Sequence, residues 1–181
     1  NPSAQLIQTD DVGHTSSTGK LAYQASFDNE RRWLGWGLLC GRVGSQHPLW
    51  SYLLRCGFTA KQAQFFLEHA CAPDIIGVNH YVTSDRHLSE SRRLFPRETW
   101  GGNGKHRYAD VEAVRALGDS GPGLAGALND AWERYGLPLA VTEVHLGCTR
   151  EEQLRWLWQA WTCAHQLQAG GMDLRAVTAW A

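Results

Sequence analysis

The segment from Pro138 to Gly147 constrains the fold more than any other part of the sequence. It reads Pro-Leu-Ala-Val-Thr-Glu-Val-His-Leu-Gly, a short apolar run that begins at a proline and contains one acid. Such a run is typical of a buried parallel strand. Side chains alternate along a strand, so one face is expected to carry Leu139, Val141, Glu143 and His145. A carboxylate in an apolar strand is costly unless it is paired or used, which makes Glu143 a candidate functional residue.

Strands and helices alternate along the rest of the chain. A capping box at Thr149 to Glu152 predicts the start of a long helix, and a second box at Thr59 and Gln62 predicts another. Hydrophobic patterns and glycine breaks predict strands at 4–9, 74–81, 138–147 and 174–180. They predict helices at 20–40, 47–57, 59–70, 110–117, 123–135 and 150–169. We expect an α/β fold with a parallel sheet, either part of a (β/α)8 barrel or a small open sheet.

Two further expectations concern packing. Residues 83–107 are polar and show no periodicity, which predicts either a functional loop over the site or partial disorder. The helix at 150–169 is expected to bury a stripe made of Leu154, Leu157, Trp158 and Trp161.

Composition excludes several classes of partner. The formal net charge of -1 gives no reason to expect a nucleic acid or an anionic membrane as a partner. No apolar run reaches the roughly 18 residues of a membrane span. Five cysteines without a C-x-x-C pair favour reduced, mostly buried thiols, and so a cytoplasmic location. No dinucleotide-binding G-x-G-x-x-G motif occurs, and we expect no cofactor.

Three segments resemble a known family. The run from Asp74 to Thr83 resembles the sixth-strand segment of family 1 glycoside hydrolases, which contains Ile-Gly followed by Asn-x-Tyr. Leu139 to Glu143 resembles the seventh-strand segment, whose Glu is the nucleophile, and Ala176 to Trp180 resembles the start of the eighth. The resemblance implies a TIM-type (β/α)8 barrel. The chain would be a single domain over residues 1–181, covering the C-terminal half of the barrel, strands five to eight, and truncated at both ends.

The resemblance also implies roles for individual residues. Glu143 would be the nucleophile in the retaining hydrolysis of a β-glycoside, and the Tyr81 hydroxyl would hold its carboxylate by a hydrogen bond. Asn79 and Trp180 would bind the carbohydrate substrate. Position alone adds two further candidates for substrate binding: His145, two residues after Glu143, and Asp11, after the first predicted strand.

The sequence departs from the family pattern at two places. Val144-His145 stands where the family has Asn-Gly, which indicates a divergent branch. The family's acid/base Glu, in a Thr-x-Asn-Glu-Pro segment, has no match in this chain.

Two other functions remain open. The missing acid/base motif leaves open a non-catalytic domain that binds a sugar or a partner. Such a divergent barrel also resembles those found fused to a dTDP-4-dehydrorhamnose reductase-type domain. A metal-dependent barrel hydrolase or isomerase would use His145, His80, His14 and Asp10, although no H-x-H or H-E-x-x-H spacing supports a metal site.

A partner is expected whichever of these functions the protein has, because half a barrel exposes two sheet edges. We expect this partner to be the missing barrel half or a second copy of the chain. The uncovered inner face is expected to carry Leu139, Val141, Ile75 and Val177.

Overall fold

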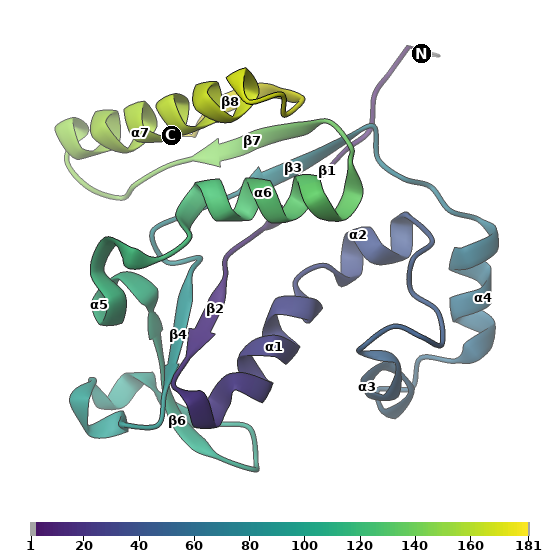
Figure 1. Ribbon diagram of the computed structural model, residues 1–181, viewed down its shortest axis with the longest axis horizontal. Coiled ribbons are helices and arrows are strands. Elements are labelled where there is room, and N and C mark those ends of the chain that lie inside the picture. Colours follow the sequence, from purple (N-terminus) through teal and green to yellow (C-terminus); the bar gives the residue numbers. More distant parts are fainter. Residues whose placement is uncertain (1–2, 181) are drawn as a thin grey trace.

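The structure, a computed structural model, describes residues 3–180 and contains two sheets (Figure 1). The ends of the predicted domain, residues 1–2 and 181, lie outside the described residues. The first sheet has four parallel strands in the order β1-β3-β7-β8. Their bounds are β1 Ile7–Asp11, β3 Ile75–Asn79, β7 Leu139–Val144 and β8 Leu174–Ala179.

Helices connect these strands. The predicted helices at 123–135 and 150–169 are confirmed with the same bounds. The two predicted caps are also present, because the Thr59 and Thr149 side chains each accept a hydrogen bond from a backbone N–H. The predicted helix at 20–40 is instead divided at Trp33, which is buried in the core, so tertiary packing overrides a continuous helix here. The helices are α1 Ala22–Arg31, α2 Leu34–Leu39, α3 Trp50–Arg55, α4 Ala60–Glu68, α5 Ala113–Leu117, α6 Gly123–Tyr135 and α7 Arg150–Ala169.

The main core lies between one face of the first sheet and its helices. Buried side chains of β3, β7 and β8 pack against α2, α6 and α7, and α6 crosses this face in Figure 1. Coverage of one face by successive helices is the arrangement of a barrel wall. No helix within residues 3–180 is long and apolar enough to cross a membrane.

A bulge in β7 corrects the predicted alternation of side chains. Val78 pairs with Val141, but the next residue, Asn79, pairs with Glu143, so Thr142 is an extra residue. Leu139, Val141 and Val144 therefore all lie in the helix-facing core. A bulge reverses the alternation beyond it. Glu143 consequently faces away from Val141, contrary to the prediction that they share a face.

The same packing corrects the expected inner face. Leu139 and Val141 have no exposed surface and contact the helices, and Val177 packs against the same core. Gly77 lies between the core-facing Ile76 and Val78, so it faces the other side of the sheet. A Cβ at Gly77 would be 2.5 Å from Thr9 Cγ2 and 2.9 Å from Thr142 Cγ2, so these two threonines lie on that side. Around Gly77 the inner face is thus lined by Thr9 and Thr142. Ile75, two residues earlier on β3, lies on the same face as Gly77, as predicted.

The predicted buried stripe of α7 is wrong for three of its four residues, while the fourth, Leu157, is partly buried and packs against the core. Leu154, Trp158 and Trp161 are 56%, 69% and 52% exposed, whereas Ala160 and Ala164 are buried. Small side chains allow α7 to approach the sheet closely, and Leu154, Trp158 and Trp161 turn outward. The expectation of mostly buried thiols was also wrong, since three of the five free cysteines are exposed.

Residues 83–107 are not a loop throughout: they contribute two strands, β4 and β5, and the first residue of β6 to a second sheet. Its strands are short, in the order β2-β4-β6-β5, with β4 and β6 antiparallel and β2 and β4 parallel. Each of β2 and β4 follows a strand of the first sheet, so the second sheet extends the first beyond its C-terminal edge (Figure 1). The bounds are β2 Thr15–Ser17, β4 Arg86–Ser89, β5 Trp100–Gly102 and β6 Arg107–Glu112.

Candidate active site

The C-terminal ends of three neighbouring strands bring polar side chains into one row. Asp11 of β1 pairs in register with Asn79 of β3, and Asn79 pairs with Glu143 of β7. The carboxyl ends of parallel strands are where barrels carry their active sites. We call Asp11, Asn79 and Glu143 the rim row.

Tyr81 contacts the rim row directly. Its hydroxyl donates a hydrogen bond to the Glu143 carboxylate. A tight turn after β3 positions the tyrosine, because its backbone N–H donates to Ser84 Oγ at 2.9 Å and Ser84 N–H donates to the Tyr81 carbonyl at 3.0 Å. The contact expected between Tyr81 and Glu143 is therefore present.

Asn79 is held by the bulged residue. The Thr142 hydroxyl donates to Asn79 Oδ1 at 2.5 Å. Thr142 reaches this position because the bulge places it next to the asparagine. The carboxamide N–H groups of Asn79 have no acceptor within residues 3–180, so they remain available to a ligand oxygen.

His145 and Trp180 tie the ends of β7 and β8 together. His145 Nδ1 donates to the Trp180 carbonyl at 3.0 Å, and Trp180 N–H donates to the Val144 carbonyl at 3.0 Å. The Trp180 side chain is 54% exposed at this edge. The structure thus places Trp180 and His145 at the same end of the sheet as the rim row.

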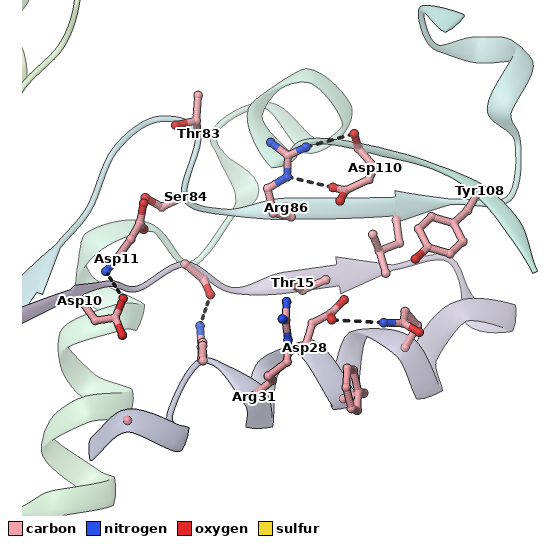
Figure 2. A pocket seen from close by; sticks show the side chains of 16 residues that line it. Asp10, Asp11, Thr15, Asp28, Arg31, Thr83, Ser84, Arg86, Tyr108 and Asp110 are labelled. Atoms are coloured by element: carbon pink, nitrogen blue, oxygen red, sulfur yellow. Dashed lines mark hydrogen bonds and ion pairs between the residues drawn. The ribbon is translucent and has the colours of Figure 1, made fainter. Parts of the chain in front are cut away.

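A wide cleft opens beside Asp11, between α1 and the second sheet (Figure 2). Its volume is about 720 Å³. Asp28 and Arg31 point into it from α1, while Arg86, Tyr108 and Asp110 line it from the second sheet. Asp10 and Asp11 lie at the end nearest the first sheet. We refer to this space as the α1 cleft.

Two polar contacts fix the walls of the α1 cleft. Arg86 Nε donates to Asp110 Oδ1 at 2.8 Å, across the β4–β6 pair. Gln24 Nε2 donates to Asp28 Oδ1 at 3.1 Å along α1. Both contacts join residues on regular elements, so the polar atoms of the walls are ordered before any ligand enters.

Burial changes the acidity of groups in the α1 cleft. Loss of solvation raises the pKa of the Asp10 and Asp28 carboxyls, and the pKa of Tyr108 rises for the same reason. For Asp28, the Gln24 hydrogen bond and the Arg31 charge oppose the rise in pKa. Asp10 and Asp28 are therefore partly desolvated carboxylates without full compensation.

The residues proposed for a metal site do not come together. His80 is buried and its Nδ1 donates to the Val12 carbonyl at 2.8 Å, while His145 is bound to Trp180. Among residues 3–180 no group of three His, Cys, Asp or Glu side chains is arranged to hold a metal ion. The described part of the chain therefore gives the metal-enzyme alternative no site.

The sequence analysis missed the α1 cleft. Asp28 and Arg31 lay in a predicted helix with no pattern that singled them out, and Arg86 lay in the segment interpreted as a loop. Two signals existed. One was Asp11, which follows the strand predicted at 4–9; the other was the alternation over 109–112, where Ala109 and Val111 are buried and Asp110 and Glu112 are not.

Comparison with known proteins identifies the fold. No family model and no curated protein matches the sequence. Among solved structures, the AHE enzyme from Alicyclobacillus herbarius matches with a TM-score of 0.69 and 13% identity, over 99% of this chain and 42% of that one. A β-glucosidase from Thermotoga maritima in complex with deoxynojirimycin gives a TM-score of 0.68 and 13% identity, over 99% and 41%. The β-glycosidase BGL167 gives 0.52 and 18%, over 99% and 33%.

This chain spans about two fifths of the length of the first two structures. Its four parallel strands with helices on one face correspond to about half of a barrel of eight. The chain therefore has the fold of part of a (β/α)8 barrel, divergent in sequence, of the kind found in family 1 β-glucosidases and related enzymes.

Proposed function

We propose that the protein hydrolyses a β-glycoside with retention of configuration and that Glu143 is the nucleophile. The observation that carries the proposal is the hydrogen bond from the Tyr81 hydroxyl to the Glu143 carboxylate at the C-terminal edge of the sheet. The similarity in fold to β-glucosidases supports the same chemistry.

In this mechanism a Glu143 oxygen attacks the anomeric carbon, while an acid group protonates the leaving oxygen. The same group, now deprotonated, then takes a proton from a water molecule, whose oxygen attacks the covalent glycosyl-enzyme and releases Glu143 as a carboxylate. Tyr81 orients the attacking carboxylate, and the free N–H groups of Asn79 bind a sugar hydroxyl. Trp180 stacks on the sugar ring, and His145 and Asp11 contact the substrate at its edges.

The second carboxylate is proposed to come from outside the described residues. A retaining pair of carboxyl groups is about 5 Å apart. Asp11, the other acid of the rim row, is two strands from Glu143, a backbone separation of roughly 10 Å. We propose that the chain forms a single domain, the C-terminal half of a barrel. Either the complementary half or a second copy would complete the site at the open edges of β1 and β8.

A non-catalytic sugar-binding domain is the second candidate. One observation favours it: no second acid in the rim row lies on a strand next to Glu143. This candidate predicts sugar binding without turnover.

The test uses the full-length protein and a panel of 4-nitrophenyl β-glycosides, with NMR of the first sugar released. The proposal predicts a β-anomer as the first product and loss of turnover in Glu143→Gln. Glu151→Gln on the exposed side of α7 is the matched control and should keep full activity. Binding without hydrolysis would favour the second candidate, and full activity in Glu143→Gln would exclude Glu143 as nucleophile.

A further inference from the structure

We propose that a pocket between the start of α6 and the middle of α7 binds a small neutral molecule that has an aromatic ring and a hydroxyl group. The hydroxyl donates a hydrogen bond to His80 Nε2. We call this space the α6–α7 pocket. The inference goes beyond the proposed glycosidase function and does not depend on it.

Position separates the α6–α7 pocket from the rim row. His80 follows Asn79 and Val144 follows Glu143 in the chain, and both His80 and Val144 line the pocket. Successive side chains of a strand point to opposite faces of the sheet. Val144 accordingly lies in the helix-facing core, whereas Glu143 faces away from it. A molecule in the α6–α7 pocket therefore lies behind the rim row and is not the glycoside held at Glu143.

The size and the walls of the pocket indicate a small, largely apolar ligand. Its volume is about 270 Å³. A cavity of about 150 Å³ holds one benzene ring, so this pocket has room for about two fused rings. The Trp156 indole offers a flat surface, which favours a planar ligand. The other apolar walls come from Pro122, Leu124, Ala125, Val144 and Ala160.

The lining favours a neutral ligand. Among the described residues that line the pocket there is no Asp, Glu, Lys or Arg. Burial raises the pKa of the Cys163 thiol, another lining group, so it stays uncharged as well. A charged ligand would lose its hydration here and gain no counterion.

His80 determines which polar group the ligand carries. The imidazole is 5% exposed, and its Nδ1 contacts the Val12 carbonyl oxygen at 2.8 Å. A carbonyl oxygen only accepts, so Nδ1 carries the proton and Nε2 of the neutral ring is an acceptor. No residue among 3–180 donates to Nε2, and His80 lines the pocket. A ligand that donates a hydrogen bond satisfies this buried acceptor.

Trp156 is a second reason to expect an oxygen on the ligand. Its Nε1 is buried and has no hydrogen-bond partner among residues 3–180. A buried donor without an acceptor costs free energy, which a slight turn of the indole toward a ligand oxygen would recover. A hydroxyl group suits both His80 and Trp156, because it donates one hydrogen bond and accepts others.

The test measures binding to the full-length protein by calorimetry with three matched compounds. The probe is 2-naphthol; 2-methoxynaphthalene has the same rings but no donor, and 2-naphthoate carries a negative charge. We expect 2-naphthol to bind at least about 10-fold more tightly than either of the others, since each leaves a buried group unpaired.

A variant of His80 tests the proposed contact. His80→Asn keeps a side-chain N–H for the Val12 carbonyl and removes the acceptor at Nε2. It should weaken 2-naphthol binding about 10-fold and abolish the preference over 2-methoxynaphthalene. His69→Asn is the matched control, because His69 Nδ1 also contacts a backbone carbonyl, that of Phe65 at 3.0 Å, and does not line the pocket. His69→Asn and Glu143→Gln should both bind 2-naphthol as the wild type does.

Each contrary result would overturn the inference. These results are no binding of 2-naphthol, equal or tighter binding of either other compound by the wild type, and unchanged affinity in folded His80→Asn. Loss of 2-naphthol binding in Glu143→Gln would place the ligand at the rim row and overturn it as well. If His80→Asn does not fold, the three compounds on the wild type decide the question.

Discussion

The hydroxyl of Tyr81 donates a hydrogen bond to the carboxylate of Glu143, and so links the chain beyond β3 to the neighbouring strand β7. Two features of the backbone make this contact. The turn at Tyr81 to Ser84 aims the tyrosine, and the bulge in β7 rotates Glu143 away from the helical core.

Removing the Tyr81 hydroxyl should impair catalysis more than stability. Hydrogen bonds to charged groups contribute about 1.5–3 kcal/mol, so Tyr81→Phe is expected to lower kcat about 10- to 100-fold. Steady-state kinetics on an aryl β-glycoside measures this. Tyr135→Phe is the matched control, since the Tyr135 hydroxyl donates to the buried Trp33 carbonyl at 3.1 Å. It should lower the melting temperature and leave kcat unchanged; equal kinetic effects of the two substitutions would contradict the account.

Gly13 is expected to tolerate no side chain. A Cβ there would lie 1.8 Å from the Ser84 carbonyl oxygen, because the connection between β1 and β2 lies against the connection between β3 and β4. Gly13→Ala should therefore lower the free energy of unfolding by at least about 3 kcal/mol. Gly19 has nothing within 4 Å of its Cβ position, so Gly19→Ala should change stability by less than about 1 kcal/mol. Urea denaturation of both variants tests the contrast, and similar midpoints would show that the Gly13 contact is not rigid.

Asp85, which directly precedes β4, links the second sheet to the start of α6 by hydrogen bonds. Its carboxylate is 8% exposed and accepts His14 N–H at 2.6 Å and Gly123 N–H, at the start of α6, at 2.9 Å. Asp85→Ala should lower the free energy of unfolding by about 2–4 kcal/mol, because two backbone donors lose a charged acceptor. Thermal melts compared with Asp119→Ala, whose carboxylate has no such contact among residues 3–180, check this. A melting temperature equal to that of the control would refute the role.

Asp28→Asn should stabilise the protein at pH 7. Burial raises the pKa of Asp28 above its ordinary 3.8, so folding favours the neutral carboxyl. The contribution of Asp28 to the free energy of unfolding is therefore fully present in the wild type below pH 3.8 and is lost as pH rises through the pKa of the folded state. Asparagine stays neutral and keeps an oxygen for Gln24. The gain in melting temperature should be present at pH 7 and absent at pH 3. A gain at pH 3 with none at pH 7 would contradict the prediction.

The sequence predicted the elements whose signals are local. Helices α6 and α7 have the predicted bounds because their ends are marked by Gly136 and by the Thr149 cap, and their length gives clear periodicity. The strands around Glu143 and Asn79 were found because a buried parallel strand is a short apolar run between breaks.

Features that depend on distant contacts were not predictable in this way. The β7 bulge appears only through pairing with β3, and it decides which face carries Glu143. The second sheet consists of short, charged strands stabilised across the sheet, as by Arg86 and Asp110, and such strands carry little apolar alternation. On α7 the choice between Ala160 and Trp161 as the buried residue depends on how closely the helix approaches the sheet.

The most direct test of the central claim is to identify the residue that becomes glycosylated. A 2-deoxy-2-fluoro-β-glycoside with a good leaving group slows release of the covalent intermediate, and mass spectrometry of proteolytic peptides then locates the sugar. The account predicts one added fluorosugar on the peptide that contains Glu143, absent in Glu143→Gln, with inactivation in parallel. A label on another carboxylate, or turnover of the reagent by Glu143→Gln at the wild-type rate, would contradict it.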